Sequence, residues 1–286
     1  MRLTHNMYSL SIYKNYKLVL SQNAKAIANT SSGKKLNSAK DNPNKIAEAQ
    51  GLKMSILSRN AASSNIQDTN SMIQTYDGAL NEMNNNVSRL KSLVVQAGND
   101  TNSEDDNQKI QEEMDSVVSS INDLSKTNFN GINMSKTQNP MDPQPVTDPQ
   151  QTASKKATIG ALDNESIDIP FFDVTPSGLG LDNLKVSGAS KDVKSASESV
   201  DKAVTQVTAI RSVYGAIQSR LDDSDSTTSE ISDSLTSAQS SIEDADIAAE
   251  SLEYSRTKVL IQAATSLIAQ GNNLPKDALN ILSSVR

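Results

Sequence analysis

Apolar residues recur with a seven-residue period through much of this chain, and this period limits the possible folds more than any other feature. One series steps from Ile66 by sevens and a second runs beside it, so gaps of three and four residues alternate. Residues three and four apart share one face of a helix, so the spacing predicts a long helix with one narrow apolar seam. The seam of this first half comprises Ile66, Ile73, Leu80, Val87 and Val94.

The same period returns in the second half of the chain. It runs over residues 193–221, passes through the polar residues 222–226 and resumes over residues 231–252. We therefore expect one helical pattern of about sixty residues, a length typical of coiled coils, with a weak point or bend at the polar segment. The seam residues of this half include Val207, Ile210 and Ile217.

Both extreme ends of the chain are also amphipathic. Gly33 and Pro43 are expected to interrupt the pattern near the start, and Gly271 and Pro275 near the end. A single partner helix cannot cover these apolar stripes, so we expect the ends to be disordered alone and to order on association. Their main apolar residues are Leu10, Leu20, Ile27, Leu260, Leu267 and Leu282.

Turn-forming residues divide the remainder. Residues 98–103 form a polar turn, after which Ser103 or a neighbouring residue can cap a second helix with an acidic first turn. Asn130 and Gly131 form a typical hairpin turn. Six of the eight prolines lie within residues 137–190, where the helical period is lost. Residues 157–162 and 165–172 are candidate short strands in this central insertion.

An apolar seam must be covered, and the nearest partner for each helical arm is the other arm. The expected fold is therefore mainly α: an elongated antiparallel helical bundle or coiled coil with both termini at one end and a small β-containing central insertion. The predicted domains are residues 1–43 with 246–286 (terminal helices), 44–136 with 190–245 (helical), and 137–189 (insertion).

The residue types that most enzymes and metal sites need are scarce in this sequence. His5 is the one histidine and there is no cysteine, which excludes a histidine-based triad, a multi-histidine metal site and thiolate ligands. The formal net charge of -7 argues against sequence-independent DNA binding. No apolar run approaches the ~20 residues of a membrane span. The first seventeen residues do not form a secretory signal peptide. We expect no cofactor, no nucleic acid and no membrane insertion.

Two short motifs have more ordinary explanations than a ligand site. Residues 31–35 faintly resemble a phosphate-binding loop but lack its first glycine and a preceding strand, so a helix-breaking polar turn is favoured. Residues 243–246 are acidic but lack the alternation and glycine of a calcium loop, so a solvated helix face is favoured.

Four separated segments, in the family's order, resemble bacterial flagellins. Residues 30–42 are similar to the motif LSSGLRINSAKDD, and residues 127–131 to TQFNG. Residues 242–250 match the signature before the C-terminal helix, and residues 262–270 are similar to QAATALLAQ. The resemblance covers roughly residues 1–136 and 190–286.

This resemblance implies a structural, non-enzymatic subunit of the extracellular flagellar filament that supports motility. It implies an inner domain of paired terminal helices, an outer helical domain and self-association into a helical homopolymer. It further implies type III export without a cleaved signal, and binding of the C-terminal helix (from about Asp246) by an export chaperone. Hook-associated and cap proteins are the other implied partners.

Residues 88–96 resemble a flagellin segment read by the toll-like flagellin receptor. Arg89 and Leu93 match its main positions, and Glu113 matches a third on the next helix. The alternative is that Arg89 and Leu93 merely flank the seam residues.

Three alternatives to a filament subunit remain open, and the first of them is also a structural assembly protein. Residues 1–7 are closer to the hook–filament junction protein, which is the nearest alternative. A chemoreceptor-like signalling coiled coil shares the heptads but not the proline-rich insertion. A flagellin with a catalytic insertion would need a longer centre that contains histidine.

Overall fold

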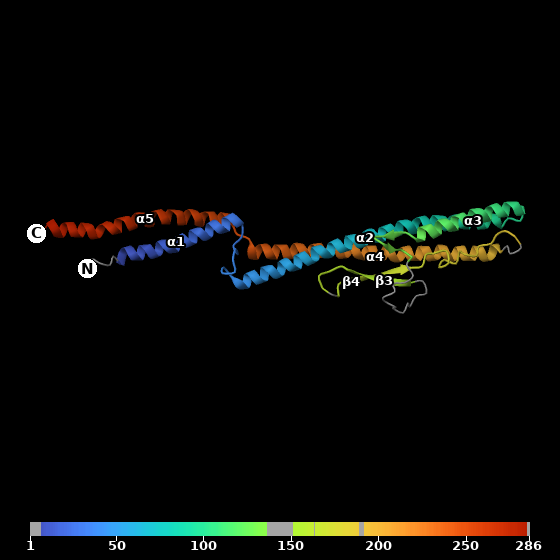
Figure 1. Cartoon of the computed structure of the whole chain (residues 1–286), viewed down its shortest axis with the longest axis horizontal. Coiled ribbons are helices and arrows are strands. Elements are labelled where there is room, and N and C mark those ends of the chain that lie inside the picture. The colour runs from blue at the N-terminus through green and yellow to red at the C-terminus, as the bar shows by residue number, and fades with distance from the viewer. Residues whose placement is uncertain (1–6, 136–150, 163, 189–191, 285–286) are drawn as a thin grey trace. The chain divides into compact units, whose positions relative to one another are not determined.

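The structure is a computed structural model that describes residues 7–135, 151–162, 164–188 and 192–284, without the side chains of residues 8, 151–153 and 274–284. It is mainly helical, as predicted (Figure 1). The chain divides into two compact units. The terminal unit comprises Met1–Ile56 with Asp233–Arg286, and the central unit comprises Leu57–Ser232. The elements in chain order are α1 (Met7–Ser32), α2 (Pro43–Ala97), α3 (Glu104–Ser125), β1 (Asn128–Phe129), β2 (Ile132–Asn133), β3 (Gln151–Thr158), β4 (Ser166–Phe172), α4 (Val193–Glu243) and α5 (Ile247–Ser284).

The core of the central unit is the predicted apolar seam. Side chains that repeat along α2 and α4 face inward, and α3 adds Ile110, Met114 and Ile121 to the same cluster. Burial of a large aliphatic side chain contributes about 1.5–3 kcal/mol, so this cluster supplies most of the stability of the unit. All eight seam residues are at most 7% exposed: Ile66, Ile73, Leu80, Val87, Val94, Val207, Ile210 and Ile217.

Polar pairs beside the seam show that α2 and α4 run antiparallel. Three positions on α2 are each bonded to α4, and the partner lies earlier in α4 as α2 advances. These pairs are Ser63 with Asp225 at 2.6 Å, Asp77 with Arg211 at 2.9 Å and Lys91 with Asp201 at 2.6 Å. The predicted pairing of the two helical arms is therefore confirmed.

The predicted start of α3 and the predicted first hairpin are both confirmed. Ser103 accepts a hydrogen bond from the Asp106 backbone, and the Asp106 side chain accepts from Ser103 in return, which forms a capping box. Asn130 and Gly131 have φ values of 48° and 76°, which the two-residue turn between β1 and β2 requires.

The second hairpin differs from its prediction at the first strand. β4 begins one residue later than the expected 165–172 segment and ends where expected. β3 pairs antiparallel with β4, but it spans Gln151–Thr158, so the prediction of a strand at 157–162 was wrong beyond Thr158. The backbone turns there because Ile159 N and Leu162 O both bond to Glu165.

An aromatic cluster fastens both hairpins to the helices of the central unit. Tyr76 of α2 and Tyr214 of α4 have ring centroids 6.4 Å apart, and Phe171 and Phe172 of β4 pack edge-on against them. The Tyr76 hydroxyl donates to the Ile132 carbonyl at 2.8 Å, and the Tyr214 hydroxyl donates to that of Pro170 at 3.1 Å. The hydroxyl groups of the two buried rings thus have polar partners, one on each hairpin.

The prediction of a bend at residues 222–226 was wrong. The prediction that the helical pattern continues to residue 252 was also wrong, since α4 ends at Glu243. Helix α4 is continuous through the polar segment because its polar side chains have partners across the seam. Asp222 accepts from Asn70, and Asp225 accepts from Ser63. The break lies at residues 244–246, where Asp246 accepts from the backbone of Ala248 and caps α5.

The predicted interruptions hold at one end of the chain and not at the other. Helix α1 ends at Ser32, before Gly33 with φ of 70°, and α2 begins at Pro43. Helix α5 instead continues through Gly271 and Pro275 to Ser284, so that prediction was wrong. Near Gly271 the helix still contacts α1, since Ser9 bonds to Asn272, and a helical penalty of about 1 kcal/mol for glycine does not end it there.

Candidate functional site

The terminal unit is a pair of antiparallel helices with almost no apolar core. Helices α1 and α5 lie side by side (Figure 1), and Ser9 near the start of α1 bonds to Asn272 near the end of α5. Among the residues that the structure describes, the buried apolar residues of this unit are Ala26 and Ala49. Two alanines bury little area, so this pair gains little hydrophobic stabilisation on its own.

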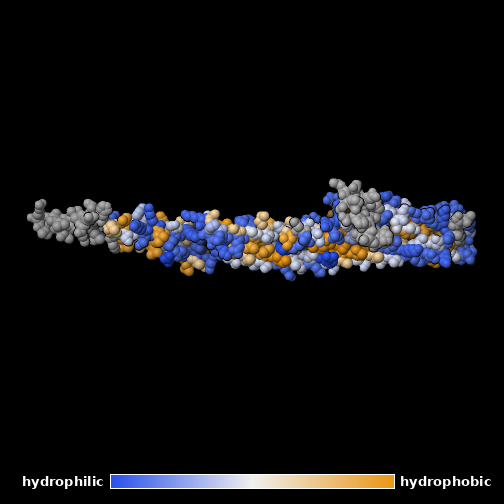
Figure 2. Space-filling view, turned by 90° about the horizontal axis from the view of Figure 1, so that it is seen from below, coloured by the Kyte–Doolittle hydropathy of each residue, from blue (hydrophilic) through white to orange (hydrophobic). Residues whose placement is uncertain are grey.

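The large apolar side chains of the same helices point into solvent. Over the described side chains, seventeen large apolar residues are exposed, and twelve of them belong to the terminal unit. Figure 2 shows apolar patches on the presented face of the terminal helices. Clustered exposed apolar surface marks an interaction site. We name this the terminal apolar surface: Met7, Leu10, Tyr13, Leu18, Leu20, Ile27, Met54, Ile247, Leu252, Val259, Leu260 and Leu267.

Five of the six predicted assembly residues belong to this surface. On α1, Leu10, Leu20 and Ile27 are 47%, 45% and 49% exposed. On α5, Leu260 and Leu267 are 38% and 42% exposed. The sixth, Leu282, lies in α5, and its side chain is outside the described residues.

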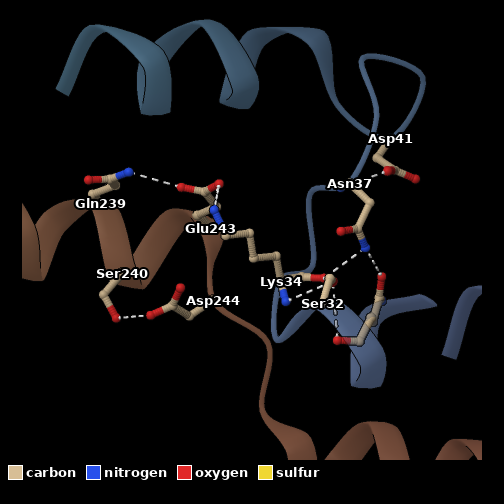
Figure 3. A network of polar contacts seen from close by, with 9 residues as sticks. Ser32, Lys34, Asn37, Asp41, Gln239, Ser240, Glu243 and Asp244 are labelled. Atoms are coloured by element: carbon tan, nitrogen blue, oxygen red, sulfur yellow. Dashed lines mark hydrogen bonds and ion pairs between the residues drawn. The ribbon is translucent and has the colours of Figure 1, made fainter. Parts of the chain in front are cut away.

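A polar clasp joins the end of α1 to the junction between α4 and α5 (Figure 3). We define the clasp as residues 32–41 with residues 239–246. Its backbone forms a short antiparallel bridge, in which Lys35 N donates to Glu243 O at 2.8 Å and Ala245 N donates to Gly33 O at 2.9 Å. The left-handed φ of Gly33 permits the sharp exit from α1 that this bridge needs.

Side chains reinforce both sides of the clasp. Lys34 Nζ lies 2.6 Å from Glu243 Oε1, and Lys35 Nζ donates to the Ser241 carbonyl at 2.6 Å. In the loop, the Asp41 carboxylate accepts from the backbone of Asn37 and Ser38, and these bonds lower the pKa of Asp41. The clasp therefore fixes the direction in which the chain leaves α1 and enters α5.

The clasp is expected to weaken in acid. Hydrogen bonds from Lys34 and then Gln239 lower the pKa of Glu243 below its ordinary 4.5. A lowered folded-state pKa stabilises the clasp above pH 4.5, and that stabilisation is lost as the pH falls through the folded value. Limited proteolysis at residues 33–42 should become faster below that pH. At pH 7 the Lys34→Met variant should already be cleaved as fast as the parent chain is in acid. Equal cleavage of Lys34→Met and the parent chain at pH 7 would show that the ion pair does not hold the loop.

The structure brings together two of the three residues predicted to bind the innate receptor and buries the third. Arg89 and Glu113 are exposed on α2 and α3, and they form an ion pair at 2.5 Å. Leu93 is 1% exposed and belongs to the core cluster. Arg89 and Glu113 are therefore accessible to a receptor, whereas Leu93 packs in the core beneath them.

Clusters of metal-ligating side chains and membrane-spanning helices are both absent from the part of the chain that the structure describes. Its acidic side chains form no cluster of three or more that could hold a metal ion. None of its helices combines the length and apolarity of a membrane span.

The sequence patterns missed the clasp and the role of Asp246. The acidic residues 243–246 were predicted to form a solvated helix face, but they lie at the helix break and contact Lys34, Ser240 and the start of α5. An aspartate directly before an apolar helical run is a common N-cap, and this signal was present. The helix break at Asp246 was not predicted because the apolar spacing of three and four residues continues across it.

Known proteins match this sequence over nearly the whole chain. Residues 3–139 match the bacterial flagellin N-terminal helical region, and residues 197–282 match the bacterial flagellin C-terminal helical region. A flagellin of Halalkalibacterium halodurans is 30% identical and covers 99% of this chain and 100% of its own length. A flagellin of Bacillus subtilis is 31% identical with the same coverage. A hook-associated flagellar protein from Vibrio parahaemolyticus resembles the fold at 13% identity and a TM-score of 0.58, covering 71% of this chain and all of its own.

The fold defines a mainly helical protein whose terminal helices expose apolar side chains. The chain belongs to the bacterial flagellin family, so it is a structural protein and not an enzyme. It is a structural subunit of the bacterial flagellar filament, and these full-length relatives favour that role over the hook–filament junction protein.

Proposed function

We propose that the subunit polymerises through its paired terminal helices, with the terminal apolar surface as the contact between copies. The observation that carries this proposal is the contrast between the units. Every buried apolar residue in the described chain except Ala26 and Ala49 lies in the central unit, while most exposed ones lie in the terminal unit. Removal of apolar surface from water is favourable and drives association between copies.

The predicted domains give each part of the chain a role in this mechanism. Residues 1–43 and 246–286 would form the inner domain, which is disordered in the monomer and orders in the filament. Residues 44–136 and 190–245 would form the outer helical domain, and residues 137–189 a variable insertion. A segment that orders on binding bears its entropy cost at that step, so ordering would be confined to the growing tip.

The contact between copies is proposed to be head-to-tail. Such a contact joins two different surface patches, and it generates an open helix when its rotation does not close a ring. Supporting this geometry, the terminal helices carry apolar residues on both members of the pair, such as Leu20 on α1 and Leu260 on α5.

Seeding tests the proposed function directly. The purified chain is mixed with fragments of its own filaments and viewed by electron microscopy. Long filaments that grow from the seeds are expected, together with protection of α1 and α5 from protease. Seeds that stay short at saturating protein would contradict polymerisation by this chain.

Membership of the flagellin family leads us to propose further partners for this subunit. Before export, a cytosolic chaperone would cover the C-terminal helix from about Asp246, since exposed residues such as Leu252 would otherwise associate early. The subunit would leave the cell through the flagellar type III apparatus and become extracellular. Cap and hook-associated proteins would meet it at the two ends of the filament.

Recognition by the toll-like flagellin receptor is proposed through Arg89 and Glu113. Arg89→Ala should reduce the response in a receptor-reporter assay, because the exposed guanidinium is lost while the core beneath it stays intact. Lys109→Ala, which removes another exposed cation from the nearby helix α3, is the matched control. A response to Arg89→Ala equal to that of the control would remove Arg89 from the receptor site.

A further inference from the structure

Two hydrogen-bonded polar pairs occupy the contact between α1 and α5, where an apolar seam would ordinarily lie. Asn23 Nδ2 donates to Thr257 Oγ1 at 2.9 Å, and Asn29 Nδ2 donates to Glu250 Oε1 at 2.9 Å. Thr257 is 0% exposed and Asn29 is 4% exposed. We name these four residues the polar keys. They take the inward positions that large apolar residues take in the central unit.

The polar keys are satisfied in this arrangement. The Thr257 hydroxyl also donates to the Glu253 carbonyl at 2.7 Å, and Asn29 Oδ1 accepts from Asn37 Nδ2 at 2.9 Å. A buried polar group that loses its hydrogen-bond partner destabilises the arrangement that buries it. Any rotation of α1 about its axis would separate Asn23 from Thr257 and would incur that destabilisation.

Apolar residues lie on more than one face of α1. Leu20 and Ile27 are 45% and 49% exposed, whereas Ile12 and Val19 are partly buried. Apolar burial alone therefore does not distinguish one rotation of α1 from another. The hydrogen bonds of the polar keys do distinguish them, because they form only between particular faces of the two helices.

We propose that the polar keys are positioning residues that decide which faces of α1 and α5 meet, and so keep the terminal apolar surface turned outward for neighbouring copies. This inference rests on the proposed function and adds the residues that orient its contact surface. Polar residues at core positions of helical bundles specify register and partner at a cost in stability. Here that cost leaves the apolar surface uncovered until a filament covers it.

Engineered cysteines can report the rotation because the chain contains no cysteine. Ser9 Oγ and Asn272 Oδ1 lie 3.3 Å apart, so Ser9→Cys with Asn272→Cys forms the native pair. Leu10 is the next residue and is turned outward at 47% exposure, so Leu10→Cys with Asn272→Cys forms the rotated pair. Each pair is oxidised in seeded filaments, and disulfides within one chain are separated from those between chains by mass. The native pair should form much more intramolecular disulfide than the rotated pair.

Substitution of the polar keys should change this ratio. The double substitution Asn23→Leu with Thr257→Val replaces the hydrogen-bonded pair by apolar side chains. The ratio of native to rotated disulfide should then fall about tenfold, which corresponds to about 1.4 kcal/mol. Seed elongation should slow in parallel. Thr257→Ser keeps the hydroxyl and should retain both ratio and rate. Gln22→Leu places the same leucine at the adjacent, exposed position of α1 and is the matched control.

The outcomes separate the inference from the proposed function. An unchanged disulfide ratio in Asn23→Leu/Thr257→Val overturns the inference, whether or not that variant elongates seeds. Failure of the parent chain to elongate seeds overturns the proposed function instead, and with it the proposed disorder of the unassembled ends. The disulfide ratio in the unassembled chain then still decides the role of the polar keys. Thr257→Val alone preserves the side-chain volume and decides the case in which the double variant does not fold.

Discussion

Removal of residues 250–286 is expected to abolish polymerisation and to leave a folded, soluble protein. The deletion takes away almost all of α5, including Leu260 and Leu267 of the terminal apolar surface. It also removes Thr257 and Glu250, the partners of Asn23 and Asn29 on α1. The central unit keeps its entire seam, since that core lies within Leu57–Ser232.

Two measurements check this deletion together. Thermal unfolding followed by circular dichroism should retain the cooperative transition of the central unit, and seeded growth should fall to zero. A matched deletion removes residues 151–172, the second hairpin, and leaves both terminal helices. It should destabilise the protein but retain the terminal apolar surface. Normal filament growth by the chain that lacks residues 250–286 would show that α5 is not needed for assembly.

Tyr214→Ala is expected to cause the largest loss of stability among single substitutions in the aromatic cluster. Tyr214 is 1% exposed and packs against Tyr76 and Phe172. Truncation of a buried aromatic ring costs about 3–5 kcal/mol, a large part of the roughly 5–15 kcal/mol that stabilises a typical domain. The free energy from urea unfolding should fall by that amount, because β4 also loses its anchor on α4.

Tyr214→Phe is the matched control for this substitution. It keeps the ring and removes only the hydroxyl that donates to the Pro170 carbonyl, so we expect a loss of about 1–3 kcal/mol. Burial raises the pKa of Tyr214, so the hydroxyl stays protonated as a donor throughout the physiological range. A loss for Tyr214→Ala no greater than that for Tyr214→Phe would mean that the ring contributes little packing.

The central unit was predictable because its signals are local and agree with one another. The heptads at Ile66 and Val207 specify helices with one apolar face, and each arm needs a partner of the same kind. Ser103 and the Asn130-Gly131 pair act within a few residues of their own positions, so backbone chemistry alone fixes their conformations. These features do not depend on contacts between distant parts of the chain.

The clasp was not predictable in the same way because it joins residues more than two hundred positions apart. Lys34 and Glu243 meet only after α1 and α5 have paired. The bend expected at residues 222–226 failed for the same reason, since Asp225 is stabilised by Ser63 of a distant helix. Polarity within one segment does not reveal whether a partner elsewhere will satisfy it.

The apolar stripes of the ends were visible in the sequence, but the polar contact between them was not. Leu10 and Leu267 follow the helical period, and a period does not say which face meets the partner. Asn23 and Thr257 decide that question through a hydrogen bond across the pair. Sequence patterning thus identifies the assembly surface, while the structure shows what turns it outward.

Thiol labelling of Ile27→Cys, before and after seeded growth, tests the covering of the terminal apolar surface most directly. The parent chain has no cysteine, and Ile27 is 49% exposed, so the introduced thiol should react quickly in the unassembled subunit. Leu162→Cys, at an exposed position of the central unit, serves as the control. We expect the thiol of Ile27→Cys to become protected in filaments by at least about tenfold, as for a side chain buried between copies. Equal labelling of this thiol in subunit and filament would contradict assembly through this surface.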